Sequence, residues 1–337
     1  MRVLVIGLGS MGKRRIRLIK QIDRSIYIIG LDSKQERREE TEKFFNIETV
    51  SELKIALEKK CDCAFICTSP LSHADLIETC LSHKMHVFTE INLVADKYDL
   101  NMKIAQEKQR VLFLSSTFLY RDEIRYIQQE VENSESLLSY TYHIGQYLPD
   151  WHPWEEYTDF FVGDIRTNGC REIMAIDFPW LYKTFGKIKD IQVKGGKKTG
   201  LKIAYNDSYL LLVEHETGVQ GTIMVDVVSR KAVRNLEIYG EDLYISWDGT
   251  PEGLKQYNIE EKEEYAVKLY SGVDKQTGYA SFVIENAYKN EILVFFNEIQ
   301  GKTQNVYDFE DDKYVLELLD NIEDRDGREC RRDVQCV

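Results

Sequence analysis

The sequence has no excess of basic residues and no long apolar segment. Its 44 lysines and arginines are outnumbered by 57 aspartates and glutamates, which gives a formal net charge of −13. Nucleic-acid binding needs a basic footprint, so this charge argues against it. No apolar run approaches the roughly 18 residues of a membrane-spanning helix, and the opening MRVLVIGLGS lacks the layout of a signal peptide. We expect a cytoplasmic protein that binds neither nucleic acid nor membrane.

Cysteine does not form a recognisable disulfide framework. The chain has seven cysteines, an odd number, and three of them lie within residues 61–67, which indicates reduced thiols. Cys80, His83 and His86 have the spacing C-x2-H-x2-H, which is compatible with a metal site. They span the end of a helix and the start of a strand, however, so their side chains should diverge from the tetrahedral geometry of zinc. We expect no metal site.

The 337 residues are enough for two domains, and we find no internal repeat. In residues 1–119, short apolar strands alternate with helical segments, which predicts a parallel sheet with right-handed crossovers. From residue 120 the pattern changes to longer strands of alternating character, and two helices close the chain. Residues 120–337 therefore predict a second domain with a mostly antiparallel sheet packed on one side.

A glycine-rich turn joins the first predicted strand to the first helix. In GLGSMG, residues 7–12, the first glycine permits a tight turn, the second lets a pyrophosphate approach, and the third allows close helix–sheet packing. The helix N-terminus then offers free N–H groups to phosphate. Asp32 ends the second predicted strand, where a carboxylate binds ribose hydroxyls. The alternative is a plain tight turn. The pattern predicts a dinucleotide site made by Gly7, Gly9, Ser10, Met11, Gly12 and Asp32.

The charges near this turn bear on the choice of dinucleotide. Asp32 favours NAD over NADP, because a carboxylate repels a 2′-phosphate. Arg14, Arg15, Lys34 and Arg37 lie near enough to blunt that preference. NAD is the expected cofactor, and NADP is the alternative.

Two further segments resemble the glucose-fructose oxidoreductase / inositol dehydrogenase / rhizopine-catabolism (Gfo/Idh/MocA) family. That family carries T-P-x-x-x-H after its fourth strand and E-K-P after the next. The segment TSPLSH, residues 68–73, matches the first element, and HVFTE, residues 86–90, matches the start of the second. The C-terminal YKNEILVFFNEIQG also looks like the family, so the resemblance covers nearly the whole chain. It implies that the cofactor is also bound by Thr68, Ser69, Pro70, His73 and Glu90.

The resemblance implies an α/β fold, with an N-terminal Rossmann parallel sheet and a C-terminal α/β domain with a large, mostly antiparallel open sheet. That open sheet often forms the oligomer interface, so we expect a homodimer or homotetramer. The implied activity is NAD(P)-dependent hydride transfer on a sugar, a polyol, or a sugar that carries phosphate or nucleotide.

Two proton-carrying positions of the family are changed. The lysine of E-K-P is Ile91 in this sequence. The family usually has Asp, and His four residues later, on one helical face, and these positions fall on Glu172 and Ile176. The usual lysine and histidine are therefore both apolar, while a carboxylate remains at Glu172. Relatives of biliverdin reductase also lack the lysine, so its loss does not exclude hydride transfer.

A polar and aromatic segment lies between these changed positions. Residues 145–170, GQYLPDWHPWEEYTDFFVGDIRTNGC, resemble a loop found in a branch linked to bacterial surface-sugar biosynthesis. Aromatic faces stack on sugar rings, while carboxylates and arginine bind hydroxyls or phosphate. The alternative is a loop that wraps a neighbouring subunit. The predicted substrate-binding residues are Trp151, Trp154, Glu155 and Arg166.

His152 is our first candidate for proton transfer, because its free pKa lies near the operating pH. Between Trp151 and Pro153 it could equally be a structural hydrogen-bonding residue. Tyr147 is the second candidate, and Glu172 could orient the acid or bind a substrate hydroxyl. As a plain alternative, Glu172 is a carboxylate favoured by a helix N-terminus. We interpret His143, on the preceding strand, as a packed sheet residue.

Three functional hypotheses remain. The first is an NAD(P)-dependent oxidoreductase acting on a carbohydrate, with acid and base groups from the His152 loop. The second is a non-catalytic protein that senses NAD(H), which the loss of both usual acid/base residues would fit. The third is a lyase or hydrolase in which NAD is reduced and reoxidised within one turnover.

Overall fold

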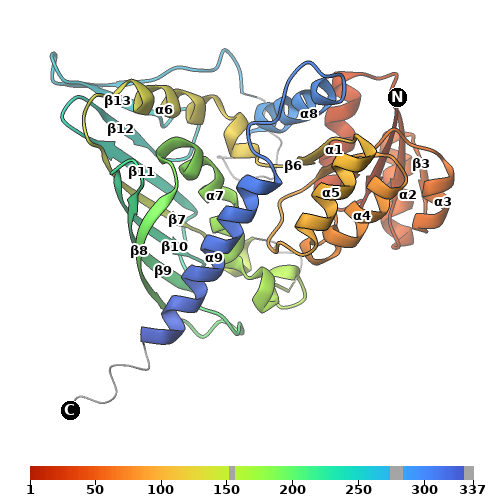
Figure 1. Ribbon diagram of the computed structural model, residues 1–337, viewed down its shortest axis with the longest axis horizontal. Coiled ribbons are helices and arrows are strands. Elements are labelled where there is room, and N and C mark those ends of the chain that lie inside the picture. Colours follow the sequence, from red (N-terminus) through yellow and green to blue (C-terminus); the bar gives the residue numbers. More distant parts are fainter. Residues whose placement is uncertain (152–155, 274–283, 330–337) are drawn as a thin grey trace. The chain divides into compact units, whose positions relative to one another are not determined.

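The computed structural model describes residues 1–151, 156–273 and 284–329 (Figure 1). The chain divides into two units. Unit 1 comprises residues 1–117 and 287–313, and unit 2 comprises residues 118–286 and 314–337. Residues 287–313 thus belong to the same unit as the N-terminal part of the chain. The predicted ranges, 1–119 and 120–337, placed this segment in the second domain. No helix among the described residues is long and apolar enough to cross a membrane.

Unit 1 is built on a parallel six-stranded sheet in the order β3-β2-β1-β4-β5-β6. Its strands are β1 Arg2–Ile6, β2 Tyr27–Leu31, β3 Glu48–Val50, β4 Cys63–Ile66, β5 His86–Thr89 and β6 Leu112–Leu114. Its helices include α1 Ser10–Ile22, α2 Gln35–Phe45, α3 Leu53–Glu58, α4 His73–Ser82, α5 Tyr98–Lys108 and most of α8 Glu285–Ile299. The strand order reverses between β1 and β4, and ligands of such sheets bind at that point, beyond the carboxyl ends of the strands.

The strands of unit 1 are apolar on both faces because helices cover both sides of a parallel sheet. Phe65 of β4 stacks on Phe88 of β5 with ring centroids 4.7 Å apart, and Phe88 stacks on Phe113 of β6 at 5.1 Å. Phe295 of α8 meets Phe88 edge to face at 5.5 Å. Helix α8 is therefore part of the core of this unit, although it is remote in sequence from the strands.

Unit 2 contains an eight-stranded sheet in the order β14-β13-β12-β11-β7-β10-β9-β8. All neighbouring strands are antiparallel except β7 and β10, which are parallel. The strands are β7 Ser139–Gly145, β8 Ile188–Gly196, β9 Ser208–His215, β10 Gln220–Asp226, β11 Val233–Tyr239, β12 Tyr244–Trp247, β13 Lys255–Asn258 and β14 Glu263–Ala266. The helices are α6 Asp122–Asn133, α7 Gly169–Phe185 and the greater part of α9 Phe309–Glu329.

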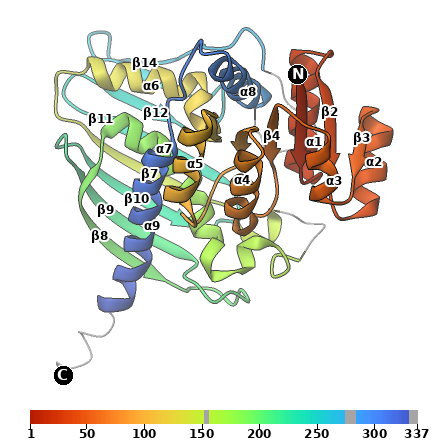
Figure 2. The same ribbon diagram turned by 45° about the vertical axis from the view of Figure 1, so that its right-hand side comes forward.

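Helices α6, α7 and α9 lie on the same face of this sheet (Figures 1 and 2). The strands alternate accordingly, with Leu211 and Val213 of β9 buried on the helix side. Leu210 and Leu212 point to the other face, and they are 42% and 54% exposed. The expected fold class is confirmed: a parallel Rossmann-like sheet is joined to an α/β unit with a large, mostly antiparallel sheet.

Candidate functional site

The glycine turn after β1 has two positions without room for a side chain and one that is open. Gly7 has φ +90°, and an added Cβ would lie 2.7 Å from the carbonyl oxygen of Cys67. A Cβ on Gly12 would lie 1.9 Å from the carbonyl oxygen of Gly7. Beside Gly9 the nearest atom is Nη1 of Arg37, at 3.8 Å. The turn is thus closed against the protein at Gly7 and Gly12 and open at Gly9, where a pyrophosphate would approach.

The first turn of α1 is suited to an anion. The helix begins at Ser10 with Gly9 as its N-cap, and no side chain caps it. No acidic residue lies in its first turn, so its free N–H groups and the positive end of the helix dipole are available to phosphate. The residues present therefore fit the pyrophosphate of a dinucleotide.

Asp32 is held at the end of β2 by backbone groups on both sides. Its Oδ2 accepts from the N–H of Leu8 at 2.8 Å, and its Oδ1 accepts from the N–H of Lys34 at 2.8 Å. Each carboxylate oxygen keeps a further lone pair, which can accept from a ribose hydroxyl. Nη1 of Arg37 lies 3.7 Å from Oδ2, so one cation does stand beside this carboxylate.

The expectation that Arg14 and Arg15 blunt the effect of Asp32 is wrong for Arg15. Its side chain is completely buried, and its guanidinium binds Glu90 and Glu291. Arg14 is also buried, and its guanidinium lies over the ring of Tyr288, 4.5 Å from the centroid. Both side chains belong to the interior of unit 1, because α1 packs its inner face on the sheet and α8.

Glu90, at the carboxyl end of β5, is positioned by Arg15. Nε of Arg15 donates to Oε1 of Glu90 at 2.6 Å, and Nη2 donates to Oε2 at 3.1 Å. Nη2 also lies 2.9 Å from Oε2 of Glu291 on α8. Burial raises the pKa of Glu291, while the positive charge of Arg15 opposes that shift. A single guanidinium thus anchors two carboxylates below the predicted cofactor site.

Thr68, Ser69, Pro70 and His73 form a compact structure between β4 and α4. Pro70 starts a 3-10 turn, Pro70–Ser72, and the hydroxyl of Ser72 lies 2.7 Å from that of Thr68. His73 is buried, with Nε2 3.0 Å from the carbonyl oxygen of Thr68. These residues therefore stand together with Glu90 at the carboxyl edge of the unit 1 sheet, next to the strand-order reversal.

In unit 2, Tyr147 follows β7 and carries the guanidinium of Arg230 on its ring, 3.7 Å from the centroid. The chain after β7 is tied to the end of β10, because the N–H of Leu148 donates to the carbonyl oxygen of Val227 at 3.0 Å. Nε1 of Trp151 donates to the carbonyl oxygen of Gln146 at 3.0 Å. The beginning of the predicted substrate loop is thus fixed by hydrogen bonds within its own unit.

Three predicted loop residues, His152, Trp154 and Glu155, lie outside the described residues. Arg166 is exposed on the 3-10 turn Ile165–Thr167, where its N–H donates to Oδ1 of Asp164 at 2.8 Å. The loop leads into α7 at Asn168.

Glu172 lies in the first turn of α7. Asn168 caps this helix by accepting from the N–H of Arg171 at 2.8 Å. Burial raises the pKa of Glu172 to about 8, and its Oε2 is inaccessible and without a hydrogen-bond partner among the described residues. A carboxyl group with such a pKa is mostly protonated at neutral pH, so it can donate a proton. One turn further on, Ile176 offers no such group.

The sequence analysis missed a histidine–carboxylate pair in unit 2. His143, interpreted as a packed sheet residue, is partly exposed, and its Nε2 lies 2.8 Å from Oδ2 of Asp226. Asp226 also accepts from the N–H groups of Val228 and Ser229. The pair forms because β7 and β10 are parallel neighbours, and no local sequence signal connects residues 83 positions apart.

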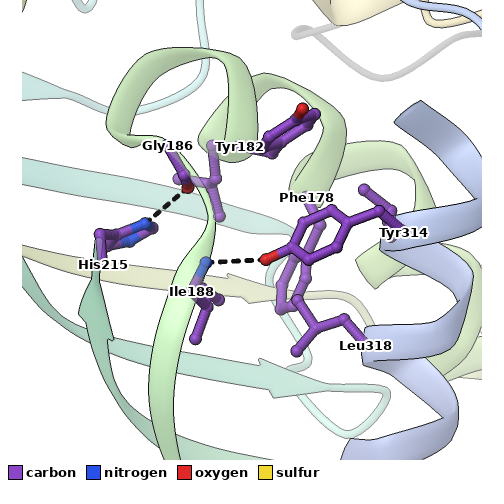
Figure 3. A pocket seen from close by; sticks show the side chains of 9 residues that line it. Phe178, Tyr182, Gly186, Ile188, His215, Tyr314 and Leu318 are labelled. Atoms are coloured by element: carbon purple, nitrogen blue, oxygen red, sulfur yellow. Dashed lines mark hydrogen bonds between the residues drawn. The ribbon is translucent and has the colours of Figure 1, made fainter. Parts of the chain in front are cut away.

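Two other features of the described residues do not form a site. No group of three or more His, Cys, Asp or Glu side chains there could hold a metal ion. A small apolar cavity lies among α7, β8, β9 and α9 (Figure 3). His215 Nδ1 lies 2.8 Å from the carbonyl oxygen of Gly186, and the N–H of Ile188 donates to the hydroxyl of Tyr314 at 2.7 Å. The cavity has room for about one water molecule, which is too little for a substrate.

The fold and the glycine turn define a Rossmann-type dinucleotide-binding protein. Residues 1–115 match the model of the oxidoreductase family with an NAD-binding Rossmann fold. That model is the Gfo/Idh/MocA one, the family that the motifs of the sequence resemble, and its match covers about a third of the chain.

Relatives of known activity match different lengths of the chain. Myo-inositol 2-dehydrogenase of Thermotoga maritima is 23% identical over 332 residues, which cover 94% of each chain. Biliverdin reductase A of Mus musculus is 31% identical over 140 residues, 40% of this chain and 46% of that protein.

Solved structures show the same fold over nearly the whole chain. UDP-N-acetylglucosamine 3-dehydrogenase of Acidithiobacillus ferrooxidans has a TM-score of 0.77 at 19% identity and covers 96% of both chains. Levoglucosan dehydrogenase in complex with NADH has a TM-score of 0.81 at 13% identity, covering 98% of this chain and 97% of that one.

Proposed function

We propose that this protein transfers hydride between NAD(H) and a carbohydrate, which is a sugar, a sugar phosphate or a nucleotide-sugar, in the biosynthesis of surface polysaccharides. The observation that carries the proposal is the open glycine turn at Gly9 beside Asp32. The full-length similarity to a dehydrogenase of a polyol, and the fold shared with a dehydrogenase of a nucleotide-sugar, support the substrate class.

The cofactor would be held by residues of unit 1. The N–H groups at Ser10, Met11 and Gly12 would bind the pyrophosphate, and Asp32 would accept from the ribose hydroxyls. Thr68, Ser69, Pro70, His73 and Glu90 would line the nicotinamide half. When bound, NAD(H) supplies or accepts the hydride. We propose NAD rather than NADP, because Asp32 repels a 2′-phosphate, although Arg37 reduces that difference.

The proton chemistry is assigned to unit 2. Ile91 and Ile176 cannot carry a proton, so neither usual group of the family is present. Glu172, whose pKa burial raises to about 8, would exchange the proton with the reacting oxygen, either directly or through Tyr147 or His152. The substrate is bound by Trp151, Trp154, Glu155 and Arg166. The exposed sheet face with Leu210 and Leu212 supports a homodimer or homotetramer.

A screen of NAD⁺ reduction and NADH oxidation with pooled sugars, sugar phosphates and nucleotide-sugars tests this proposal. One pool should react. For the reacting pool, Glu172→Gln and Tyr147→Phe should lower kcat by about 10²- to 10⁴-fold, the usual contribution of a general acid or base. Glu156→Gln, an exposed carboxylate of the same loop, should have no such effect.

A sensor of NAD(H) is the second candidate, and the two isoleucines at Ile91 and Ile176 favour it. It predicts NADH binding without turnover on any pool, together with a stable protein partner. Tightly held NAD that does not exchange with added NAD, with a solvent deuterium label entering the product, would instead favour a lyase or hydrolase.

A further inference from the structure

Asn92, two residues after Glu90, has a buried side chain that contacts His73. Both residues are 2% exposed. The side-chain oxygen of Asn92 lies 2.7 Å from Nδ1 of His73, and the hydroxyl of Thr89 lies 3.2 Å from the same nitrogen. Nε2 of His73 lies 3.0 Å from the carbonyl oxygen of Thr68. Both ring nitrogens are therefore held by groups of unit 1.

The hydrogen-bonding capacity of imidazole decides how these groups are arranged. A neutral imidazole has one N–H donor and one acceptor nitrogen. The carbonyl of Thr68 can only accept, so Nε2 must carry the hydrogen, and Nδ1 then needs a donor. The hydroxyl of Thr89 donates its one hydrogen to the carbonyl oxygen of Glu90 at 3.2 Å, so it does not fill this role. The amide nitrogen of Asn92 becomes the donor when its side chain turns over, which exchanges two atoms of nearly equal size. In the other orientation Nδ2 of Asn92 faces the hydroxyl of Tyr98 and makes no well-formed hydrogen bond among the described residues.

The alternative is an imidazolium that donates to both oxygens. It would place a positive charge where burial lowers the pKa of His73. Glu90 is the acidic group nearest in the interior, and Arg15 already binds both of its oxygens. Asp75, on the same helix, pairs with Lys97 at the surface.

Glu78, also on α4, pairs with the same lysine, and the other titratable groups around His73 are neutral. Burial raises the pKa of the Cys67 thiol after β4 and of the Tyr98 hydroxyl on α5 well above their usual ranges. His86 of β5 lies at the other end of its strand, where its Nδ1 accepts from the N–H of Val111 at 3.0 Å. None of these groups supplies a negative charge that would stabilise an imidazolium.

We propose that Asn92 is a positioning residue that keeps His73 neutral with its hydrogen on Nε2, and that the resulting hydrogen bond to Thr68 fixes the Thr68–Pro70 turn of the cofactor site. The carboxyl edge of the unit 1 sheet then contributes no proton near neutral pH. This inference rests on the proposed role of the Thr68–Pro70 turn in binding the cofactor.

The tautomer can be measured directly by ¹⁵N NMR of the full-length protein labelled at histidine, with His73 assigned by the loss of its signals in His73→Gln. The expected result is an unprotonated Nδ1 and a protonated Nε2, unchanged over roughly pH 5 to 8. In Asn92→Asp the new carboxylate can only accept, so His73 should become an imidazolium. An imidazolium or an Nδ1–H tautomer in the unchanged protein, or an unaltered tautomer in Asn92→Asp, would overturn the proposal.

Cofactor affinity separates positioning from a merely structural role. Asn92→Ala should weaken NADH binding about 2- to 10-fold, the equivalent of one hydrogen bond. Asn101→Ala is the matched control, because Asn101 is a fully buried asparagine that donates to the carbonyl oxygen of Ala74. It should lower the Tm similarly and leave NADH affinity unchanged. Equal losses of affinity in both variants would contradict the proposal. If the unchanged protein bound no NADH, the proposed cofactor site would fail, while the NMR result would still decide the tautomer.

Discussion

Arg15 and Glu90 form a buried two-point ion pair, with donor–acceptor distances of 2.6 and 3.1 Å. The same guanidinium also binds Glu291, and both Arg15 and Glu291 have 0% exposure. Glu90 begins the segment in which Ile91 stands where the family that the sequence resembles has a lysine. Arg15 therefore connects helix α1, which follows the glycine turn, with the end of β5 and with helix α8, near the proposed cofactor site.

Arg15→Met should destabilise the protein by about 3–5 kcal/mol, because it leaves two buried carboxylates without their cation. Urea unfolding followed by circular dichroism measures this loss. Arg24→Met, at an exposed arginine just after the same helix, is the control and should change stability by less than about 0.5 kcal/mol. Equal stability of the two variants would show that the ion pair contributes little.

Gly9→Ala and Gly12→Ala should have different consequences. Gly9 has φ −73° and open space beside it, so Gly9→Ala should fold normally and lose NADH affinity by at least about 10-fold. Gly12→Ala should lower stability by about 1–3 kcal/mol, because its Cβ would overlap the carbonyl of Gly7. Thermal unfolding and NADH titration distinguish them. Gly200→Ala, also in open space, is the control, and unchanged affinity in Gly9→Ala would place the pyrophosphate elsewhere.

Asp32→Asn should reduce the preference for NADH over NADPH by about 10-fold or more, since it removes the charge that repels a 2′-phosphate while keeping an oxygen for the backbone. Arg37→Ala should act in the opposite direction and weaken NADPH more than NADH. Parallel fluorescence titrations with the two cofactors measure both ratios. A preference that neither variant changes would mean that the adenine ribose does not lie at Asp32.

The stability of the protein should depend on pH through Glu172. Folding raises its pKa from 4.5 to about 8, so the folded protein retains a proton that the unfolded chain releases. The stability contributed by this group is complete below about pH 4.5 and is lost as the pH rises toward 8. Glu172→Gln should abolish this part of the slope in urea unfolding at several pH values. The Glu156→Gln control should keep it, and parallel slopes in all three proteins would argue that Glu172 has an ordinary pKa.

The elements with local sequence signals were predicted correctly. Apolar strands, the spacing of GLGSMG and the alternation of helix and strand all lie within short segments, so the two-part α/β fold followed from them. The parallel pairing of β7 with β10 did not follow, because register between distant strands depends on packing of the whole sheet. The burial of Arg15 in ion pairs was missed for the same reason, because its partners, Glu90 and Glu291, come from segments remote in sequence.

In the candidate site, too, the residues that belong to a local motif were predicted better than the others. The glycine turn and Asp32 lie where their motif placed them, and their roles as cofactor ligands stay predictions to be tested. The proton donor was harder to predict from the sequence. The presence of a histidine or tyrosine, such as His152 or Tyr147, does not show which groups surround it in the fold. The structure adds a physical reason to consider Glu172, namely a raised pKa and an oxygen that has no hydrogen-bond partner among the described residues.

Titration of the purified, intact protein with NADH and NADPH, followed by cofactor fluorescence, tests the central claim most directly. We predict saturable binding of NADH that is tighter than that of NADPH and is weakened at least about 10-fold in Gly9→Ala. If neither cofactor bound, the assignment of the glycine turn and Asp32 as a dinucleotide site would be contradicted, and the proposed hydride transfer would have no basis in this chain.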